Sequence, residues 1–243
     1  MNVNIGGGTF QYEGWLNVDR QTGFAITPNT LFPVSDESVD LVYSSHFLEH
    51  CDDETVERVL DEAHRMLKPD GALVIKLPDA GQVLERWRDG DEAYFDQWGQ
   101  QKVWPTWKNL GVPVNIDSKA AMIFCGGWND AYGDEFGERH PEALGAYHGP
   151  VPKMDYAAVR DFEPSPHSLA VRMREEWVRN FGTPHWNHQN AWSSTEFIAL
   201  LKEHDFAAII EGADQVCQAH PHIPGIGFQR HISMYFQCRP LHK

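Results

Sequence analysis

The chain has 243 residues and is strongly acidic, with 20 lysines and arginines against 35 aspartates and glutamates. Its formal net charge of −15 at pH 7 repels a phosphate backbone, which argues against nucleic acid as a partner. The mean hydropathy is −0.48, and no apolar run approaches the roughly 18 residues that a membrane span needs. The sequence therefore predicts one globular domain, residues 1–243, with no membrane segment.

The N-terminus and the cysteines carry no recognisable motif. No basic stretch or apolar core of an export signal follows Met1, which predicts a cytoplasmic protein. The four cysteines are scattered and form no CxxC pair, which argues against both a disulfide framework and a cysteine zinc site. We expect them to be buried thiols: Cys51, Cys125, Cys217 and Cys238.

Three short apolar stretches open the chain, and each predicts a strand. Asn2–Ile5 runs into the glycine triplet Gly6, Gly7 and Gly8, Trp15–Val18 ends at Asp19, and Val39–Tyr43 follows a polar turn. A helix is predicted next, because apolar residues recur at helical spacing between the capping residues Asp52 and Asp53 and the helix breaker Pro69.

A turn at Asp70-Gly71 is expected to lead into the strand Ala72–Leu77. That run does not alternate, which is typical of a central parallel strand covered on both faces. The strand, helix and strand together imply a right-handed crossover.

The chain from about residue 80 to 183 is irregular and rich in Trp, Pro, Gly, Asp and His. Helical pieces are predicted only near Gln82–Arg88 and Leu169–Phe181, and we interpret the stretch as an insertion that serves as a lid. A capping box from Ser193 to Glu196 then predicts a helix over Phe197–His204. Two strands are expected to end the chain, Ala207–Glu211 and a last antiparallel strand with Ile232, Met234, Phe236 and Cys238 on one face.

The glycine triplet and Asp19 fit a nucleoside ligand. Glycines let a ligand approach the backbone closely, and an acidic residue at the end of the next strand can accept hydrogen bonds from two ribose hydroxyls. The GxGxxG spacing that opens a helix in dinucleotide enzymes is absent, so no pyrophosphate cradle is indicated. The pattern favours S-adenosylmethionine (SAM) over NAD. A nicotinamide reductase is a weaker alternative. The purely structural alternative is that the three glycines form an ordinary turn and bind no ligand.

The stretch from Leu31 to His50 reads LFPVSDESVDLVYSSHFLEH, followed after the predicted helix by Met66–Gly71 and the strand Ala72–Ile75. These segments resemble the core of class I SAM-dependent methyltransferases. Gly14–Asp19 is similar to the variant of that family in which the first helix is reduced to a loop. The resemblance implies a Rossmann-like α/β sheet, mostly parallel with an antiparallel last strand, that binds SAM across its carboxyl edge.

The resemblance also implies which residues bind the cofactor. They are Gly6, Gly7, Gly8, Asp19, Asn29, Leu31, Ser45 and His46. The family often has an acidic residue before the turn that begins at Leu31, to meet the adenine amino group, and here Asn29 or backbone carbonyls are expected to substitute. Only 21 positions separate Asp19 from Asp40, so the family's third strand is expected to be short or degenerate.

The predicted reaction is methyl transfer from SAM to an oxygen or nitrogen of a small-molecule acceptor, with a homodimer left open. The protein would align the acceptor and remove its proton, and a histidine suits that task. His46 is the first predicted base because it follows the fourth strand of the family's sheet, and His188 is the next. Aromatic walls line small-molecule pockets, so we predict Trp128, Asn129 and His185 as acceptor-binding residues.

The motif from His46 to His50 leaves two metal-dependent alternatives open. HxxEH is typical of one class of zinc peptidases, but a hydrolase would leave the glycine triplet and Asp19 unexplained. Some SAM enzymes hold a cation with a similar motif, here His46, Glu49, His50 and a later His such as His188. We predict no metal, with Glu49 and His50 packed internally. A catalytically degenerate SAM-binding module also remains open.

Overall fold

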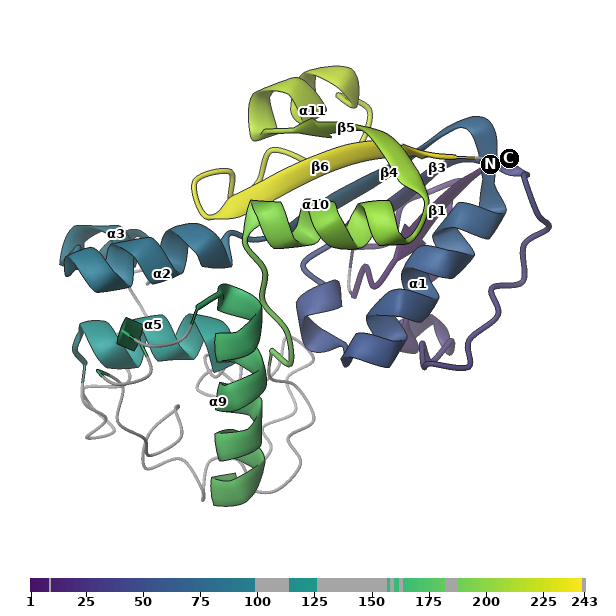
Figure 1. Ribbon diagram of the computed structural model, residues 1–243. Coiled ribbons are helices and arrows are strands. Elements are labelled where there is room, and N and C mark those ends of the chain that lie inside the picture. Colours follow the sequence, from purple (N-terminus) through teal and green to yellow (C-terminus); the bar gives the residue numbers. More distant parts are fainter. Residues whose placement is uncertain are drawn as a thin grey trace. The chain divides into compact units, whose positions relative to one another are not determined.

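The sheet contains six strands: β1 (Asn2–Ile5), β2 (Leu16–Val18), β3 (Val39–Ser45), β4 (Leu67–Pro78), β5 (Phe206–Glu211) and β6 (Ser233–Pro240). Their order is β2-β1-β3-β4-β6-β5 (Figure 1). The first four run parallel, and β6 is antiparallel to both β4 and β5. The predicted Rossmann-like α/β sheet with an antiparallel last strand is thereby confirmed.

The computed structural model describes residues 1–8, 10–98, 114–125, 157, 160–161, 164–181 and 188–241. The chain divides into two compact units, which we describe separately. The first unit, Met1–Pro78 with Ser194–Lys243, holds the sheet. The second unit, Asp79–Ser193, comprises the stretch between β4 and the helix that begins at Ser194. A single domain with an insertion over about 80–183 stays a prediction.

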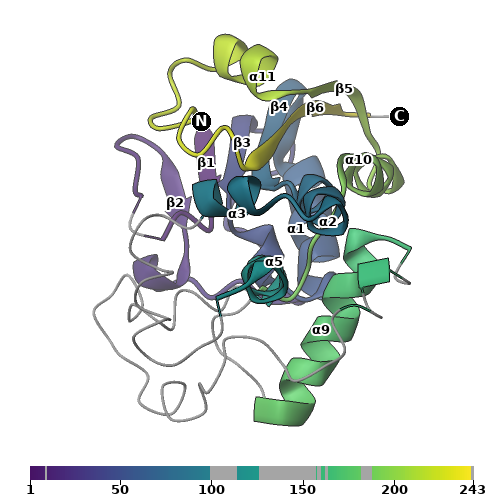
Figure 2. The same cartoon turned by 90° about the vertical axis from the view of Figure 1, so that its left-hand side faces the viewer.

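Helices cover both faces of the sheet in the first unit (Figures 1 and 2). α1 (Asp53–Met66) and α10 (Ser194–Glu203) lie on one face, and α11 (Ala213–Ala219) lies on the other. The predicted cap of α1 is confirmed, because the Asp52 side chain accepts a hydrogen bond from the Thr55 amide at 2.9 Å. α10 begins three residues earlier than predicted, and α11 was not predicted.

The start of β4 corrects one prediction. The strand begins at Leu67, so the expected turn at Asp70-Gly71 lies inside it. Val39 pairs with Leu67 and Leu41 with Ala72, which leaves the residues between Leu67 and Ala72 as a bulge in the ladder. A Cβ on Gly71 would lie 2.9 Å from the Val39 carbonyl oxygen, so the two strands approach too closely there for a side chain.

The family's third strand, expected to be short or degenerate, does not form in the described residues. After β2, at the edge of the sheet, the chain forms a 3₁₀ turn at Arg20–Thr22 and no strand until β3. The backbone of this segment bonds to α1 instead: the buried Glu62 carboxylate accepts the Phe32 amide at 2.8 Å, and Arg65 donates to Glu62 at 2.7 Å. Side chains of α1 therefore hold the connection that a strand would otherwise hold.

Two asparagine side chains organise the loop between β1 and β2, where the described residues form no helix, in agreement with the prediction. The buried Asn4 amide donates to the Phe10 carbonyl at 2.8 Å and to Asn17 Oδ1 at 3.1 Å. The Asn17 amide donates in turn to the Tyr12 carbonyl at 2.9 Å and to the Trp15 carbonyl at 3.2 Å. These side chains satisfy backbone groups that a helix would satisfy internally.

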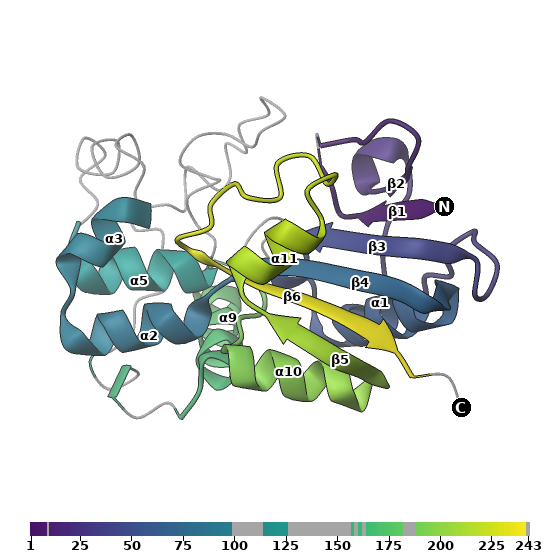
Figure 3. The same cartoon turned by 90° about the horizontal axis from the view of Figure 1, so that it is seen from above.

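The second unit is helical in its described residues, with α2 (Ala80–Asp89), α3 (Glu92–Trp98), α5 (Ile116–Cys125) and α9 (Pro166–Phe181) (Figure 3). The helices over Gln82–Arg88 and Leu169–Phe181 were predicted, and α3 and α5 were not. Trp87 is fully buried, and its indole donates to Asp117 Oδ1 at 2.7 Å. Within the described parts of the chain, no helix is long and apolar enough to cross a membrane.

Replacing Asn4 by alanine should destabilise the first unit. The variant removes the Asn4 donor from the Phe10 carbonyl and one of two donors from Asn17 Oδ1, which keeps the Tyr12 amide, and a lost buried partner costs about 1–3 kcal/mol. Asn2→Ala is the matched control, because Asn2 lies on the same strand and its side chain forms no hydrogen bond with the described residues. Urea unfolding of both variants checks the prediction. Equal stabilities for the two variants would contradict it.

Candidate active site

The glycine triplet turns the chain sharply at the carboxyl end of β1. Gly6 and Gly8 have φ values of +69° and +54°, in the left-handed region that favours glycine. A Cβ on Gly6 would lie 1.9 Å from the ring of Phe47, and a Cβ on Gly7 would lie 2.2 Å from Asn4 Nδ2. Packing of the chain itself therefore requires glycine at both positions, and it brings the backbone of β1 against the segment after β3.

Asp19, at the end of β2, is tied directly to this turn. Its Oδ2 accepts a hydrogen bond from the Gly8 amide at 3.1 Å, and its Oδ1 accepts one from the Gln21 amide at 2.8 Å. Each carboxylate oxygen keeps a further lone pair, and the side chain is only half-buried. The structure thus brings the predicted glycine and acidic residues together, with acceptors of the kind that bind a vicinal diol.

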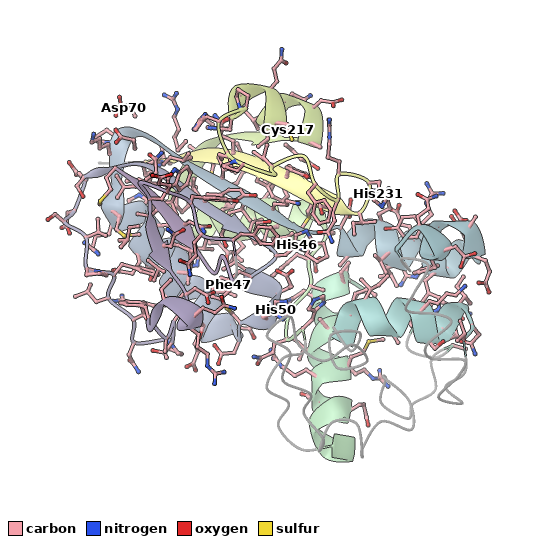
Figure 4. The ribbon with its side chains drawn as sticks, turned by 180° about the vertical axis from the view of Figure 1, so that it is seen from behind. His46, Phe47, His50, Asp70, Cys217 and His231 are labelled. Atoms are coloured by element: carbon pink, nitrogen blue, oxygen red, sulfur yellow. The ribbon has the colours of Figure 1, made fainter. Side chains whose placement is uncertain are left out.

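His46 follows β3 in a strained conformation, at the end of the sheet opposite to Asp70 (Figure 4). Its φ of +50° is uncommon for a residue with a side chain, and such strain concentrates at functional sites. Its ring touches a partner at each nitrogen: Nδ1 lies 3.2 Å from Glu49 Oε1, and Nε2 lies 2.9 Å from Ser233 Oγ. Both partners are buried.

The two partners decide which nitrogen of His46 can take a proton. Glu49 Oε1 lies at ion-pair distance from Nδ1, and an ionised carboxylate there can only accept, which favours the tautomer with its hydrogen on Nδ1. Nε2 then presents its lone pair to the Ser233 hydroxyl, which donates to it. When Nε2 takes a proton, the Glu49 carboxylate meets the charge that forms. A carboxylate, an imidazole and a hydroxyl in this order can move a proton away from a reacting group.

One comparison with known proteins bears on these residues. A family model described as a methyltransferase domain matches residues 18–75, which include Asp19, His46 and Glu49. The match spans β3, α1 and most of β4, and it leaves out β1 with the glycine triplet and β6 with Ser233. The strand order agrees with the Rossmann-like fold that the sequence predicts. Residues 18–75 are therefore similar to a methyltransferase domain.

Solved structures similar to this chain share little sequence with it. An S-adenosylmethionine dependent methyltransferase from Mesorhizobium loti is 14% identical, with a TM-score of 0.42 and coverage of 98% of this chain and 89% of that one. A SAM-dependent methyltransferase from Thermotoga maritima, described as a possible histamine N-methyltransferase, is 13% identical (TM-score 0.37; coverage 99% and 82%). A putative one from Listeria monocytogenes is 12% identical (TM-score 0.39; coverage 99% and 91%). The curated proteins contain no match.

The polar groups around the turn after β1 fit SAM. Asp19 offers a carboxylate for ribose hydroxyls, and the turn after β1 opens no helix in the described residues that would attract a phosphate. SAM carries a ribose and no phosphate. Asn29 and Leu31 are both exposed, Leu31 to 64%, on the segment between β2 and β3.

The remaining predicted residues belong to the second unit. His188 is buried, and its Nδ1 lies 2.6 Å from the Ile123 carbonyl oxygen, to which it donates. Trp128, Asn129 and His185 lie outside the described residues. Of the predicted catalytic and acceptor-binding residues, only His46 is placed within the sheet unit.

The zinc-peptidase alternative fails on geometry. That class needs both histidines of HxxEH on one face of an α-helix. His46 instead has a positive φ and precedes the 3₁₀ turn Leu48–His50, so the two histidines do not share an α-helix.

Two functional candidates escaped the sequence analysis, Lys76 and Ser233. Lys76 lies in the run Ala72–Leu77, which the sequence already indicates to be buried on both faces, so a lysine there was a usable signal. Ser233 has no such local signal. It reaches His46 only because β6 pairs antiparallel with β4, which sets Ser233 opposite Pro78.

Lys76 is a buried cation on the sheet face covered by α11. Its side chain is 2% exposed, and burial lowers the pKa of the amine to about 8. Nζ donates to the Phe228 carbonyl and lies 5.7 Å and 5.6 Å from the ring centroids of Phe228 and Tyr235. Burial also raises the pKa of the neighbouring phenols Tyr43 and Tyr235.

The buried amine predicts a specific dependence of stability on pH. Lysine titrates near pH 10.4 in an unfolded chain and at about 8 here, so between these values only the unfolded chain holds the proton. The contribution of Lys76 to stability therefore rises with pH across that window. Relative to Lys76→Met, the parent should gain roughly 2–3 kcal/mol between pH 7 and pH 10.5.

Urea unfolding of parent and variant across this pH range measures the difference. Tyr43, Tyr235, Cys217 and Glu49, the other titratable groups that act on Lys76 or lie beside it, are common to both chains and largely cancel. A stability difference that does not change with pH would show that the lysine is not buried as described.

Proposed function

We propose that the protein is a class I SAM-dependent methyltransferase that transfers the methyl group of SAM to a hydroxyl or amine of a small-molecule acceptor, with His46 as the general base. The observation that carries the proposal is the Glu49–His46–Ser233 arrangement at the carboxyl end of β3. In open α/β sheets, ligands bind at the carboxyl ends of the strands. The acidic net charge favours a small acceptor over nucleic acid and suits a cytoplasmic enzyme.

We assign cofactor binding to the residues that surround the turn after β1. Gly6, Gly7 and Gly8 supply backbone at close range, and Asp19 accepts the ribose hydroxyls. Asn29 and the exposed Leu31 are proposed to contact the adenine, Asn29 through its amide and Leu31 through its apolar surface. Ser45, which ends β3, and the backbone of His46 directly after it complete the set.

In this mechanism the chain positions the acceptor and removes one proton. Bound SAM supplies an electrophilic methyl group on a sulfonium that already carries its leaving group. The acceptor group donates to Ser233 Oγ or replaces it beside Nε2, and its proton passes to Nε2 as the new bond to carbon forms. Glu49 holds Nδ1 and stabilises the charged ring until the proton returns to water.

A catalytically degenerate SAM-binding protein is the alternative. The strained φ of His46 and the buried carboxylate behind it favour catalysis, because a binding protein needs neither. Incubation with labelled SAM and a metabolite extract decides between the two. A labelled product supports the enzyme and identifies the acceptor, whereas slow hydrolysis of SAM with no product from any extract supports the alternative.

Asp19→Asn should weaken binding of S-adenosylhomocysteine (SAH) by roughly 10–100-fold, the worth of a hydrogen bond to a charged acceptor. Asparagine keeps the shape of the side chain and one acceptor oxygen, so the fold should persist. Asp70→Asn, at the other end of the sheet, is the control (Figure 4). Calorimetric titration of the three proteins measures the affinities. Equally tight binding by the Asp19 variant would remove this residue from the site.

His46→Ala should lower turnover of the identified acceptor by roughly 10²–10⁴-fold at saturating SAM, the usual worth of a positioned base. SAH affinity should hardly change, because the ring is assigned to the acceptor and not to the cofactor.

His204→Ala is the matched control for His46→Ala. His204 also pairs with a carboxylate, Asp61 at 2.8 Å, and lies in the turn after α10, before the amino end of β5. That variant should turn over at the parent rate. If His46→Ala instead loses SAH affinity and keeps its rate at saturation, His46 binds the cofactor and is not the base.

A further inference from the structure

Lys76 is a buried positive charge without a negative partner. Its side chain is 2% exposed between the buried residues Ile75 and Leu77. No carboxylate in the described parts of the chain forms an ion pair with Lys76. Its partners are the Phe228 carbonyl oxygen and the rings of Phe228 and Tyr235. An ammonium removed from water is strongly disfavoured unless an anion compensates it, so this arrangement needs an explanation.

The lysine carries its charge at neutral pH. Burial lowers its pKa to about 8, which still leaves the amine mostly protonated at pH 7. Glu49 is the carboxylate that acts on this pKa, and it is already paired with His46. Burial raises the pKa of the neighbouring phenols Tyr43 and Tyr235, so they carry no negative charge at pH 7.

The position of Lys76 is that of a ligand-binding residue. It lies near the carboxyl end of β4, in register with Ser45 of β3, and its carbonyl accepts the His46 amide at 2.9 Å. The proposed base and the buried cation are therefore joined through a backbone hydrogen bond at the edge of the sheet where ligands bind. Figure 4 shows His46 at this end of the sheet, together with His231 from the segment before β6.

A single segment of chain covers the ammonium. The Phe228 carbonyl accepts from both Lys76 Nζ and the Tyr235 hydroxyl, while the Phe228 side chain is 64% exposed. The turn that presents this carbonyl is built around Gly225, with φ of +70°, and Gln229, with φ of +58°. A carbonyl dipole compensates only part of a full charge, so a ligand anion can compete with it for Nζ.

We propose that Lys76 is the counter-ion of a ligand carboxylate, which binds Nζ in place of the Phe228 carbonyl. This inference rests on the proposed function. Two ligands of the site can supply the carboxylate: the amino-acid portion of SAM, or an acid group on the methyl acceptor. Both present the same chemistry to the lysine.

Binding measurements distinguish the two sources. In the first arm, the parent is titrated with SAH and with its primary carboxamide, which lacks only the negative charge. In the second arm, SAH-saturated protein is titrated with benzoate and with benzamide. The parent should prefer the carboxylate by 10-fold or more in one arm, and that arm identifies the source. Lys76→Met should abolish the preference, and Lys76→Arg should retain part of it.

Lys68→Met is the matched control, because Lys68 lies on the same strand and pairs with Asp40 at the other end of it. This variant should keep the parent's preference. Absence of a carboxylate preference in both arms, or a preference that survives Lys76→Met, would overturn the inference. A parent that fails to bind SAH at all would instead overturn the proposed function, so the two failures are distinguishable. Urea unfolding confirms that each variant is folded.

Discussion

The pairing of β3 with β4 at their carboxyl ends is the interaction on which the site depends. One backbone hydrogen bond, from the His46 amide to the Lys76 carbonyl, closes this parallel ladder just where β3 ends. It holds His46 in its left-handed conformation, and from there the ring reaches Glu49 and Ser233. β6 then pairs with the other edge of β4 and supplies Ser233 and Tyr235. β3, β4 and β6 thereby hold their residues around the hydrogen bond between His46 and Lys76.

The region around this point is built from polar side chains that satisfy the backbone. Asn4 and Asn17 bind the carbonyls of the loop after β1, and Glu62 and Arg65 of α1 bind the backbone between β2 and β3. In each case a side chain does what a helix or a strand does elsewhere in folds of this kind. The sheet can therefore end at the short strand β2, because these side chains fix the positions of the loops beside it.

Local sequence patterns were enough to predict the helices and strands that neighbouring residues in the sequence determine. The cap at Asp52 and the apolar spacing after it place α1, and the unbroken apolar run places most of β4. The bulge at Asp70-Gly71 could not be predicted, because a turn motif and a bulge use the same residues and only the pairing with Val39 separates them. The α11 helix escaped because seven residues are too few for a clear periodic pattern.

The candidate site likewise contains some residues that local sequence patterns reveal and others that they do not. Asp19 and the glycine triplet were readable because the strand and turn that carry them adjoin in sequence, whereas the Ser233 partner of His46 is 187 residues away. Lys76 was visible as a lysine in a buried run, but its meaning depends on which groups surround it, and those come from the segment before β6.

The loop after β1 has a consequence for ligand selection. Nucleotide-binding folds commonly aim the positive end of a helix at a phosphate, and the described residues between β1 and β2 contain no such helix. Asp19 also occupies the Gly8 amide, one of the donors that a phosphate would need. Together with a net charge of −15, these features disfavour a phosphate group at the turn after β1. The proposed site should therefore select against ATP and NADPH through electrostatics.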